Sequence, residues 1–268
     1  MKPLLLTLAL LCLFPALQAQ SYRPIAERQF KSLVGTIYLL PFFLDTEASR
    51  WTEEEVETCL THLKSSEDWI MGQAAPYNVE LKFSDDFVSS KDEEIMIDST
   101  VRNRSSINLL KITMEQLGFD SYGTYLRFHG LDATKQKVYV VFFMKALRSI
   151  SHEPNPTDCI LIYYDASFSD KMCPTLIAHE LLHFFGAWDL YHEEGRLSKE
   201  LADKATRLYP KSIMKCRTCP YLEIDELTAW LIGWNQNYKE AFNEFSPQNY
   251  KRESKTRVQF DLKKKDRE

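Results

Sequence analysis

The sequence HELLHFFGAWD, from His179 to Asp189, directly continues the run ILIYYDASFSDKMCPTLIA at 160–178. The run starts as an apolar, β-rich segment and predicts a buried strand at about 159–165, followed by a helix at about 171–187. Most positions of this helix are apolar, so we expect it to be buried. Buried histidine and glutamate side chains need partners, and a bound ion would provide one. The strand and helix therefore predict the centre of the fold and a functional site on it.

The two histidines of this helix have the spacing of metal ligands. His179 and His183 are four residues apart, so both imidazoles lie on one face of the helix and can reach the same ion. Glu180 lies about 100° further around the helix, close to the ion but not required as a ligand. It can accept a proton from a water molecule, as the glutamate of the HExxH motif does. A catalytic zinc site usually has a third protein ligand and an open position for water.

The third ligand could come from Asp189, His192 or Glu200, which all follow His183 in the sequence. Gly186 can end the helix in a left-handed turn, after which the chain returns to the ion at Asp189. A carboxylate oxygen binds zinc as imidazole nitrogen does. His192 and Glu200 remain alternatives, the first three residues after Asp189 and the second in a following helix.

The string HExxHxxGxxD resembles the metzincin clan of zinc endopeptidases, in the variant with a final aspartate that snapalysin-type enzymes have. Members of the clan also have a tight turn with a methionine beneath the metal, and Ser212-Ile213-Met214 is similar to it. The resemblance covers roughly residues 36–235, but its specific part is confined to 179–189 and 212–214. Some members carry a tyrosine two residues after the methionine, where this chain has Cys216, so no tyrosine is assigned.

The resemblance implies a zinc endopeptidase with one catalytic Zn²⁺. It implies that zinc activates a water molecule and that Glu180 acts as general base. An extended peptide or protein substrate would add to a sheet edge, supplied by one of the runs at 137–165. The alternative is a zincin-fold zinc-binding or interaction protein without proteolytic activity, but a purely structural site would not need Glu180. The other implied roles are zinc binding by His179, His183 and Asp189, the helix-ending turn at Gly186 and support of the metal by Met214.

The rest of the chain alternates between apolar strands and helices. Thr52, with Glu55 three residues later, is a capping box that predicts a helix over 52–72. A second helix begins at Ser105 and ends at Gly118, and the polar residues 84–104 before it are expected to form a loop. The other expected elements are strands at 36–44, 78–83 and 137–144 and helices at 197–208 and 223–235.

This alternation predicts an α/β or α+β fold, a twisted and mostly parallel sheet with helices packed on it. With the resemblance, we expect a zincin-like domain over residues 20–245, with the active-site helix at a cleft. The N-terminal part would span about 36–187, and the C-terminal part, about 188–245, would be mainly helical and contain the methionine turn. Residues 246–268 read as a polar, basic tail.

The N-terminus predicts export. Residues 1–19 read as a signal peptide, with an apolar run that follows Lys2 and a small residue, Ala19, at a plausible cleavage position. We therefore expect a secreted or periplasmic protein, and no other segment predicts a membrane span. Five cysteines follow the signal, so at least one thiol is expected to be unpaired, with Cys59 the first choice. Spacing does not decide the pairing of Cys159, Cys173, Cys216 and Cys219.

The charge distribution bears on the partners of the protein. The formal net charge is −5, although residues 251–268 carry eight lysines and arginines against four acidic residues. The body of the protein is therefore acidic, which argues against nucleic acid as a partner. We expect a monomer that acts on a peptide or protein.

Overall fold

The computed structural model describes residues 32–84, 94–97, 106–145, 159–164, 174–192, 197–216 and 221–246. The predicted signal peptide at 1–19 and all but the first residue of the predicted tail lie outside these ranges, as do Cys173 and Cys219.

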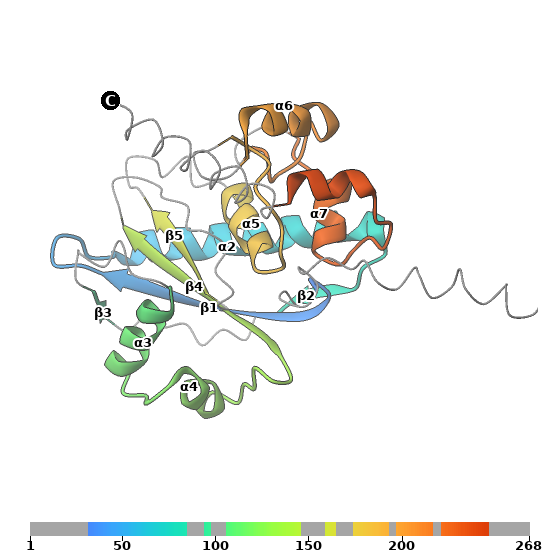
Figure 1. The fold of residues 1–268 in the computed structure, drawn as a ribbon. Coiled ribbons are helices and arrows are strands. Elements are labelled where there is room, and N and C mark those ends of the chain that lie inside the picture. Colours follow the sequence, from blue (N-terminus) through green and yellow to red (C-terminus); the bar gives the residue numbers. More distant parts are fainter. Residues whose placement is uncertain are drawn as a thin grey trace, which may run out of the picture.

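The centre of the described structure is a sheet of five strands, and every pairing in it is parallel. The strand order is β2-β1-β4-β5, and the short β3 pairs with the end of β1 (Figure 1). The predicted parallel sheet with packed helices is thus confirmed. Its long strands are apolar along nearly their whole length, as is usual for parallel strands covered on both faces. The bounds are β1 Gly35–Asp45, β2 Leu81–Phe83, β3 Ile95–Met96, β4 Lys137–Lys145 and β5 Cys159–Tyr164.

Alternate residues of β1 point to opposite faces of the sheet and enter two separate hydrophobic cores. Leu39 and Phe43 pack in the core that includes α2 (Glu53–Ala74) and α5 (Pro174–His183). Phe42 and Leu44 pack in the core that includes α3 (Ser106–Gln116) and α4 (Tyr122–Phe128). The helices therefore form a layer on each face of the sheet (Figure 1).

Helix α2 begins where the capping box predicts. The Thr52 side chain accepts from the backbone N–H of Glu55, and the Glu55 carboxylate accepts from the backbone N–H of Thr52. Glu55 also forms an ion pair with Lys145 at the end of β4. The start of α2 is thereby fixed to the carboxyl ends of the central strands.

The described C-terminal part of the chain has helices joined by irregular segments and no strand of the sheet. It contains α6 (Lys199–Leu208), α7 (Glu226–Leu231) and the 3₁₀ helix η5 (Glu240–Phe245). The predicted helix at 223–235 is shorter than expected, because Asp225 caps α7 and the residues before it are extended. The η5 helix was not predicted; it buries Phe242 and Phe245 in the same core as α5.

Two further elements, a strand of the sheet and a helix, were also not predicted. Strand β3 lies in the segment expected to be a loop, and it is held by pairing with Leu44 and Asp45 of β1. Helix α4 is short and contains Gly123, so its sequence lacks a clear helical pattern. Ser121 caps it, and Tyr125 and Leu126 anchor it in the core. Both elements depend on contacts with residues distant in sequence.

Two cysteines bear on the sequence-based expectations. The Cys59 thiol is free and fully buried on α2, as predicted. Burial, followed by the negative charge of Glu55, raises the pKa of Cys59 to about 12, so the thiol is protonated and unreactive at neutral pH. Cys216 is disulfide-bonded.

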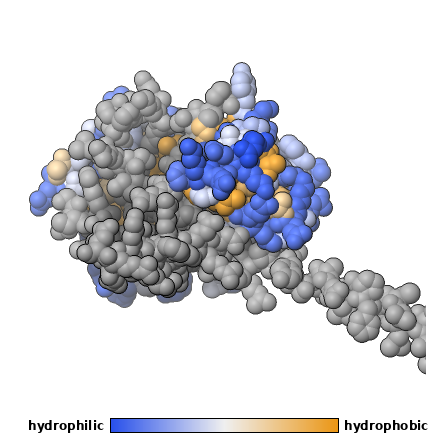
Figure 2. Space-filling view, turned by 45° about the horizontal axis from the view of Figure 1, so that its top comes forward, coloured by the Kyte–Doolittle hydropathy of each residue, from blue (hydrophilic) through white to orange (hydrophobic). Residues whose placement is uncertain are grey.

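The described surface that Figure 2 turns toward the viewer is mostly hydrophilic, with hydrophobic residues in small patches. None of the helices in the described ranges combines the length and the apolar composition needed to cross a membrane. The large hydrophobic side chains that are exposed in those ranges are Phe128, Leu208, Tyr221 and Tyr238.

Candidate metal centre

The two histidines of α5 are buried, and a backbone carbonyl holds one nitrogen of each ring. Nδ1 of His179 lies 3.0 Å from the carbonyl oxygen of Ile213, and Nδ1 of His183 lies 2.8 Å from that of Ala187. A carbonyl oxygen only accepts hydrogen bonds, so Nδ1 is the protonated nitrogen in both rings. In the neutral form, each Nε2 therefore carries a lone pair and can bind a cation.

The chain leaves α5 through the predicted turn. Gly186 has a φ of 94°, in the region that favours glycine, and the N–H of Ala187 bonds to the carbonyl of Leu182 over 3.2 Å. The chain then reverses, and Asp189 points back at α5. Its Oδ1 atom lies 3.1 Å from Nε2 of His179 and 3.4 Å from Nε2 of His183.

Asp189 and His183 each shift the pKa of the other. Burial alone would raise the pKa of Asp189, but the charge of His183 and contacts with both histidines hold this pKa well below its usual range. Burial would likewise lower the pKa of His183, yet the attraction of Asp189 and Glu180 and the bond to Ala187 leave it raised. The carboxylate of Asp189 is therefore ionised at neutral pH and attracts positive charge to this position.

Glu180 completes a group that could hold a metal ion. One ligand atom each from His179, Glu180 and His183 lies within 4.8 Å of the others. The Glu180 side chain is 12% exposed, and its Oε2 lies 4.0 Å from Nε2 of His183, further away than Asp189 Oδ1. Glu180 is thus beside the two imidazole nitrogens and retains access to solvent.

Residues 212–215 form a tight turn that contacts α5. The N–H of Lys215 bonds to the carbonyl of Ser212 over 3.1 Å, and the Met214 side chain is fully buried. The carbonyl of Met214 accepts from the N–H of Leu190 over 2.8 Å, while that of Ile213 contacts His179. The turn therefore contacts both the helix and the returning chain.

The residues that the sequence leaves as alternative third ligands are exposed. His192 is exposed, and its Nδ1 lies 2.8 Å from the carbonyl oxygen of Leu197. Glu200 is exposed in the first turn of α6. The contact of Tyr191 with His179 was not predicted; the two ring centroids lie 6.2 Å apart. Only the place of Tyr191 two residues after Asp189 could have indicated that it lies near the site.

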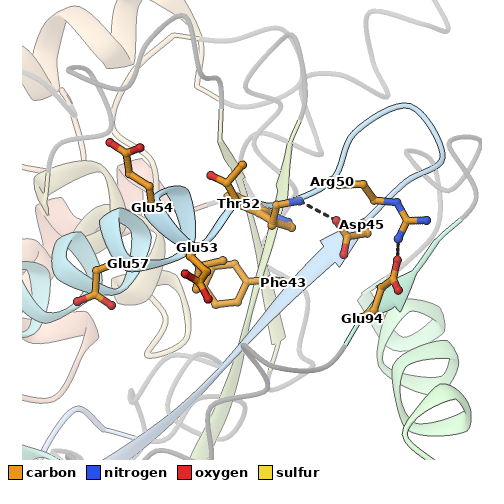
Figure 3. Close-up of a pocket in the computed structure, with 10 residues that line it drawn as sticks. Phe43, Asp45, Arg50, Thr52, Glu53, Glu54, Glu57 and Glu94 are labelled. Atoms are coloured by element: carbon orange, nitrogen blue, oxygen red, sulfur yellow. Dashed lines mark hydrogen bonds and ion pairs between the residues drawn. The ribbon is translucent and has the colours of Figure 1, made fainter.

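A separate pocket of about 790 Å³ lies at the end of β1 and the start of α2 (Figure 3). It shares no lining residue with the candidate metal centre. Asp45 accepts from the N–H of Trp51 over 2.8 Å, and Arg50 forms an ion pair with Glu94. The other acidic side chains lie in the first turns of α2, where negative charge is favourable to the helix dipole. Local structure thus explains the acidity of this pocket.

No protein-family model matches the chain, and no curated protein is significantly similar to it in sequence.

Proposed function

We propose that the chain is an exported zinc-dependent endopeptidase, with zinc bound by His179, His183 and Asp189. The observation that carries this proposal is the convergence of Asp189 Oδ1 on both Nε2 atoms, at 3.1 and 3.4 Å. With Nδ1 protonated in each ring, three electron-pair donors face one point. Such an arrangement is unfavourable unless a positive charge lies among the three atoms.

The spacing of the donors supports zinc. Ligand bonds of 2.0–2.1 Å in a tetrahedron place neighbouring ligand atoms about 3.3–3.4 Å apart. The two measured nitrogen–oxygen separations, 3.1 and 3.4 Å, are close to this value. Two neutral imidazoles and one carboxylate also form an ordinary donor set for zinc.

The hydrogen bonds that hold the two imidazoles fit a metal site as well. Metal-binding histidines usually donate the other ring N–H to a carbonyl or carboxylate, which fixes the ring and makes the ligand nitrogen more basic. His179 and His183 both do so, through Ile213 and Ala187.

The position of Glu180 supports peptide hydrolysis as the reaction. A zinc ion supplies a Lewis acid that polarises the peptide carbonyl and activates water for attack. The Glu180 carboxylate accepts the proton of the attacking water and then delivers it to the nitrogen of the leaving amine. The carbonyl carbon gains a bond to oxygen, the carbon–nitrogen bond breaks, and no covalent intermediate with the protein is required.

The sheet offers a surface for an extended substrate. β5 is the outermost described strand next to β4, and α5 contacts it. A peptide that pairs with such an edge would bind through its main chain. We therefore assign the substrate class as extended peptides or unfolded protein segments.

Export is supported by two observations. The N-terminal sequence has the form of a signal peptide. Cys216 is disulfide-bonded, and disulfides persist mainly in oxidising compartments.

Purified mature protein should cleave a casein-type substrate or a peptide library. A zinc chelator should abolish this activity, and added zinc should restore it. Glu180→Gln should retain stoichiometric zinc but lose about 10²–10⁴-fold in kcat, because the general base is removed. Cleavage that survives in Glu180→Gln contradicts the mechanism. Stoichiometric zinc in a protein that cleaves no substrate supports the non-proteolytic alternative.

A further inference from the structure

A buried hydroxyl connects the turn beneath the candidate metal centre to helix α7. The Ser212 side chain is fully buried, and its Oγ donates to Oδ2 of Asp225 over 2.5 Å. The same Oγ accepts from the backbone N–H of Met214 over 3.1 Å. One hydroxyl thus joins the interior of the turn to a carboxylate on another element.

Helix α7 fixes the orientation of that carboxylate. Oδ1 of Asp225 accepts from the N–H groups of Leu227 and Thr228, and Oδ2 also accepts from the Thr228 hydroxyl over 2.7 Å. The residue is only 6% exposed. A buried carboxylate with this many donors has one strongly favoured orientation. Asp225 can therefore hold Ser212 because α7 holds Asp225.

The other side of the turn contacts both arms of the candidate metal centre. The carbonyl of Ile213 accepts from Nδ1 of His179, and the next carbonyl, of Met214, accepts from the N–H of Leu190. Leu190 directly follows Asp189. If the peptide groups of the turn rotate, the His179 ring and the Asp189 carboxylate lose their alignment together.

We infer that Ser212 and Asp225 are positioning residues for the metal centre, which set the direction of the two carbonyls that orient His179 and the Asp189 loop. The inference rests on the proposed metal site. It adds that the geometry of this site depends on a hydroxyl–carboxylate bond outside the ligand set.

The test uses three variants of the mature protein. Ser212→Ala removes the hydroxyl from the turn. Asp225→Asn retains an oxygen that can cap α7 but replaces the charged acceptor of Ser212. Thr228→Val is the matched control, because it removes a second buried hydroxyl, on α7 and not in the turn, that donates to the same Asp225 oxygen. The measurements are zinc affinity, the visible absorption of Co²⁺ bound in place of zinc, and thermal unfolding.

We expect Ser212→Ala to weaken zinc binding by about 10–100-fold, which is the usual cost of losing a hydrogen bond that orients a metal ligand. It should also change the Co²⁺ spectrum. Asp225→Asn should have the same effects to a smaller degree. Thr228→Val should lower the unfolding temperature but leave zinc affinity within about twofold and the spectrum unchanged. Equal losses of zinc affinity in Ser212→Ala and Thr228→Val would overturn the inference.

Wild-type protein separates this inference from the proposed function. If the wild type binds no zinc or Co²⁺, the proposed metal site is wrong. If it binds zinc and only the contrast between Ser212→Ala and Thr228→Val fails, the positioning role alone is wrong. If Ser212→Ala does not fold, Asp225→Asn against Thr228→Val provides the same contrast, and equal zinc affinity in those two also overturns the role.

Discussion

The imidazoles of His179 and His183 are restricted by the carbonyls that bind their Nδ1 atoms. Each Nδ1 has a protein acceptor, so neither ring can flip without losing a buried hydrogen bond. Both Nε2 atoms consequently face Asp189. A histidine pair that served only for packing would not need a carboxylate at this point, whereas a cation site does.

Replacement of Asp189 tests this assignment at the residue scale. We expect Asp189→Ala to lower zinc affinity by more than about 100-fold. Loss of a residue that only orients a ligand usually costs up to about 100-fold, and loss of a ligand should cost more. His192→Ala should retain stoichiometric zinc, because the His192 side chain is exposed, whereas those of the proposed ligands are buried. Metal analysis of the dialysed proteins measures both. Zinc loss from His192→Ala with zinc retained by Asp189→Ala would show that His192, and not Asp189, is the third ligand.

Several helices of the described chain end in the same way. A glycine with positive φ follows the helix, and the N–H of the next residue bonds to the carbonyl five positions before it. This ending turns the chain sharply, and after α5 it directs Asp189 back to the histidines. The glycines in these positions are Gly118, Gly130, Gly186 and Gly233.

Gly233, which follows α7, has a second constraint that can be measured separately. Its φ is 84°, and a Cβ on it would lie 2.6 Å from Cβ of Ser32. Gly118, which follows α3, has a φ of 78° and no atom within 4 Å of such a Cβ. Gly118→Ala should therefore cost about 1–2 kcal/mol of unfolding free energy, from backbone strain alone. Gly233→Ala should cost about 1–3 kcal/mol more, from overpacking.

Urea denaturation of the two glycine variants measures the difference. Equal losses of unfolding free energy would mean that the segment at Ser32 yields to the added methyl group. That segment is tied to α7, because the N–H of Leu33 bonds to the carbonyl of Ile232 over 2.9 Å.

At the scale of the whole molecule, the site joins parts that are distant in sequence. The histidines are on α5, which packs on α2 and the sheet. Met214 lies in the C-terminal part. Its residue Glu223 pairs with the turn, and Ile224 bonds to Gln73 at the end of α2 and to Tyr77 just after α2. A metal bound between α5 and the returning loop should therefore stabilise the fold as a whole.

Metal removal tests this coupling. A ligand at about 1,000 times its dissociation constant stabilises the folded state by about 4 kcal/mol. For a chain of this size, a chelator should then lower the unfolding temperature on the order of 10 °C. Differential scanning calorimetry with and without chelator measures the shift, and Asp189→Ala should show none. A chelator shift that persists in Asp189→Ala would indicate a different metal site.

Local patterns in the sequence predicted much of the fold. The capping box of Thr52 and Glu55, the apolar runs of β1 and β4, and the glycine after α5 each depend on neighbours in the chain. Strand β3 and helix α4 were not predicted because both are short. β3 is held by its pairing with β1, and α4 is held by its contacts with the core. The contact between Tyr191 and His179 was not predicted, because no residue spacing indicates that the two rings lie side by side.

The sequence by itself determined the helix with His179, Glu180 and His183 on adjoining positions, and the turn at Gly186, because helical spacing and backbone sterics are local. Only the tertiary structure decided which atom of each imidazole is available. That choice depends on the carbonyls of Ile213 and Ala187, and Ile213 is brought beneath α5 by the hydrogen bonds of a turn 34 residues after His179 in the chain. For His179 a long-range hydrogen bond sets this geometry, and no local pattern encodes it, whereas the Ala187 carbonyl that holds His183 is only four residues away.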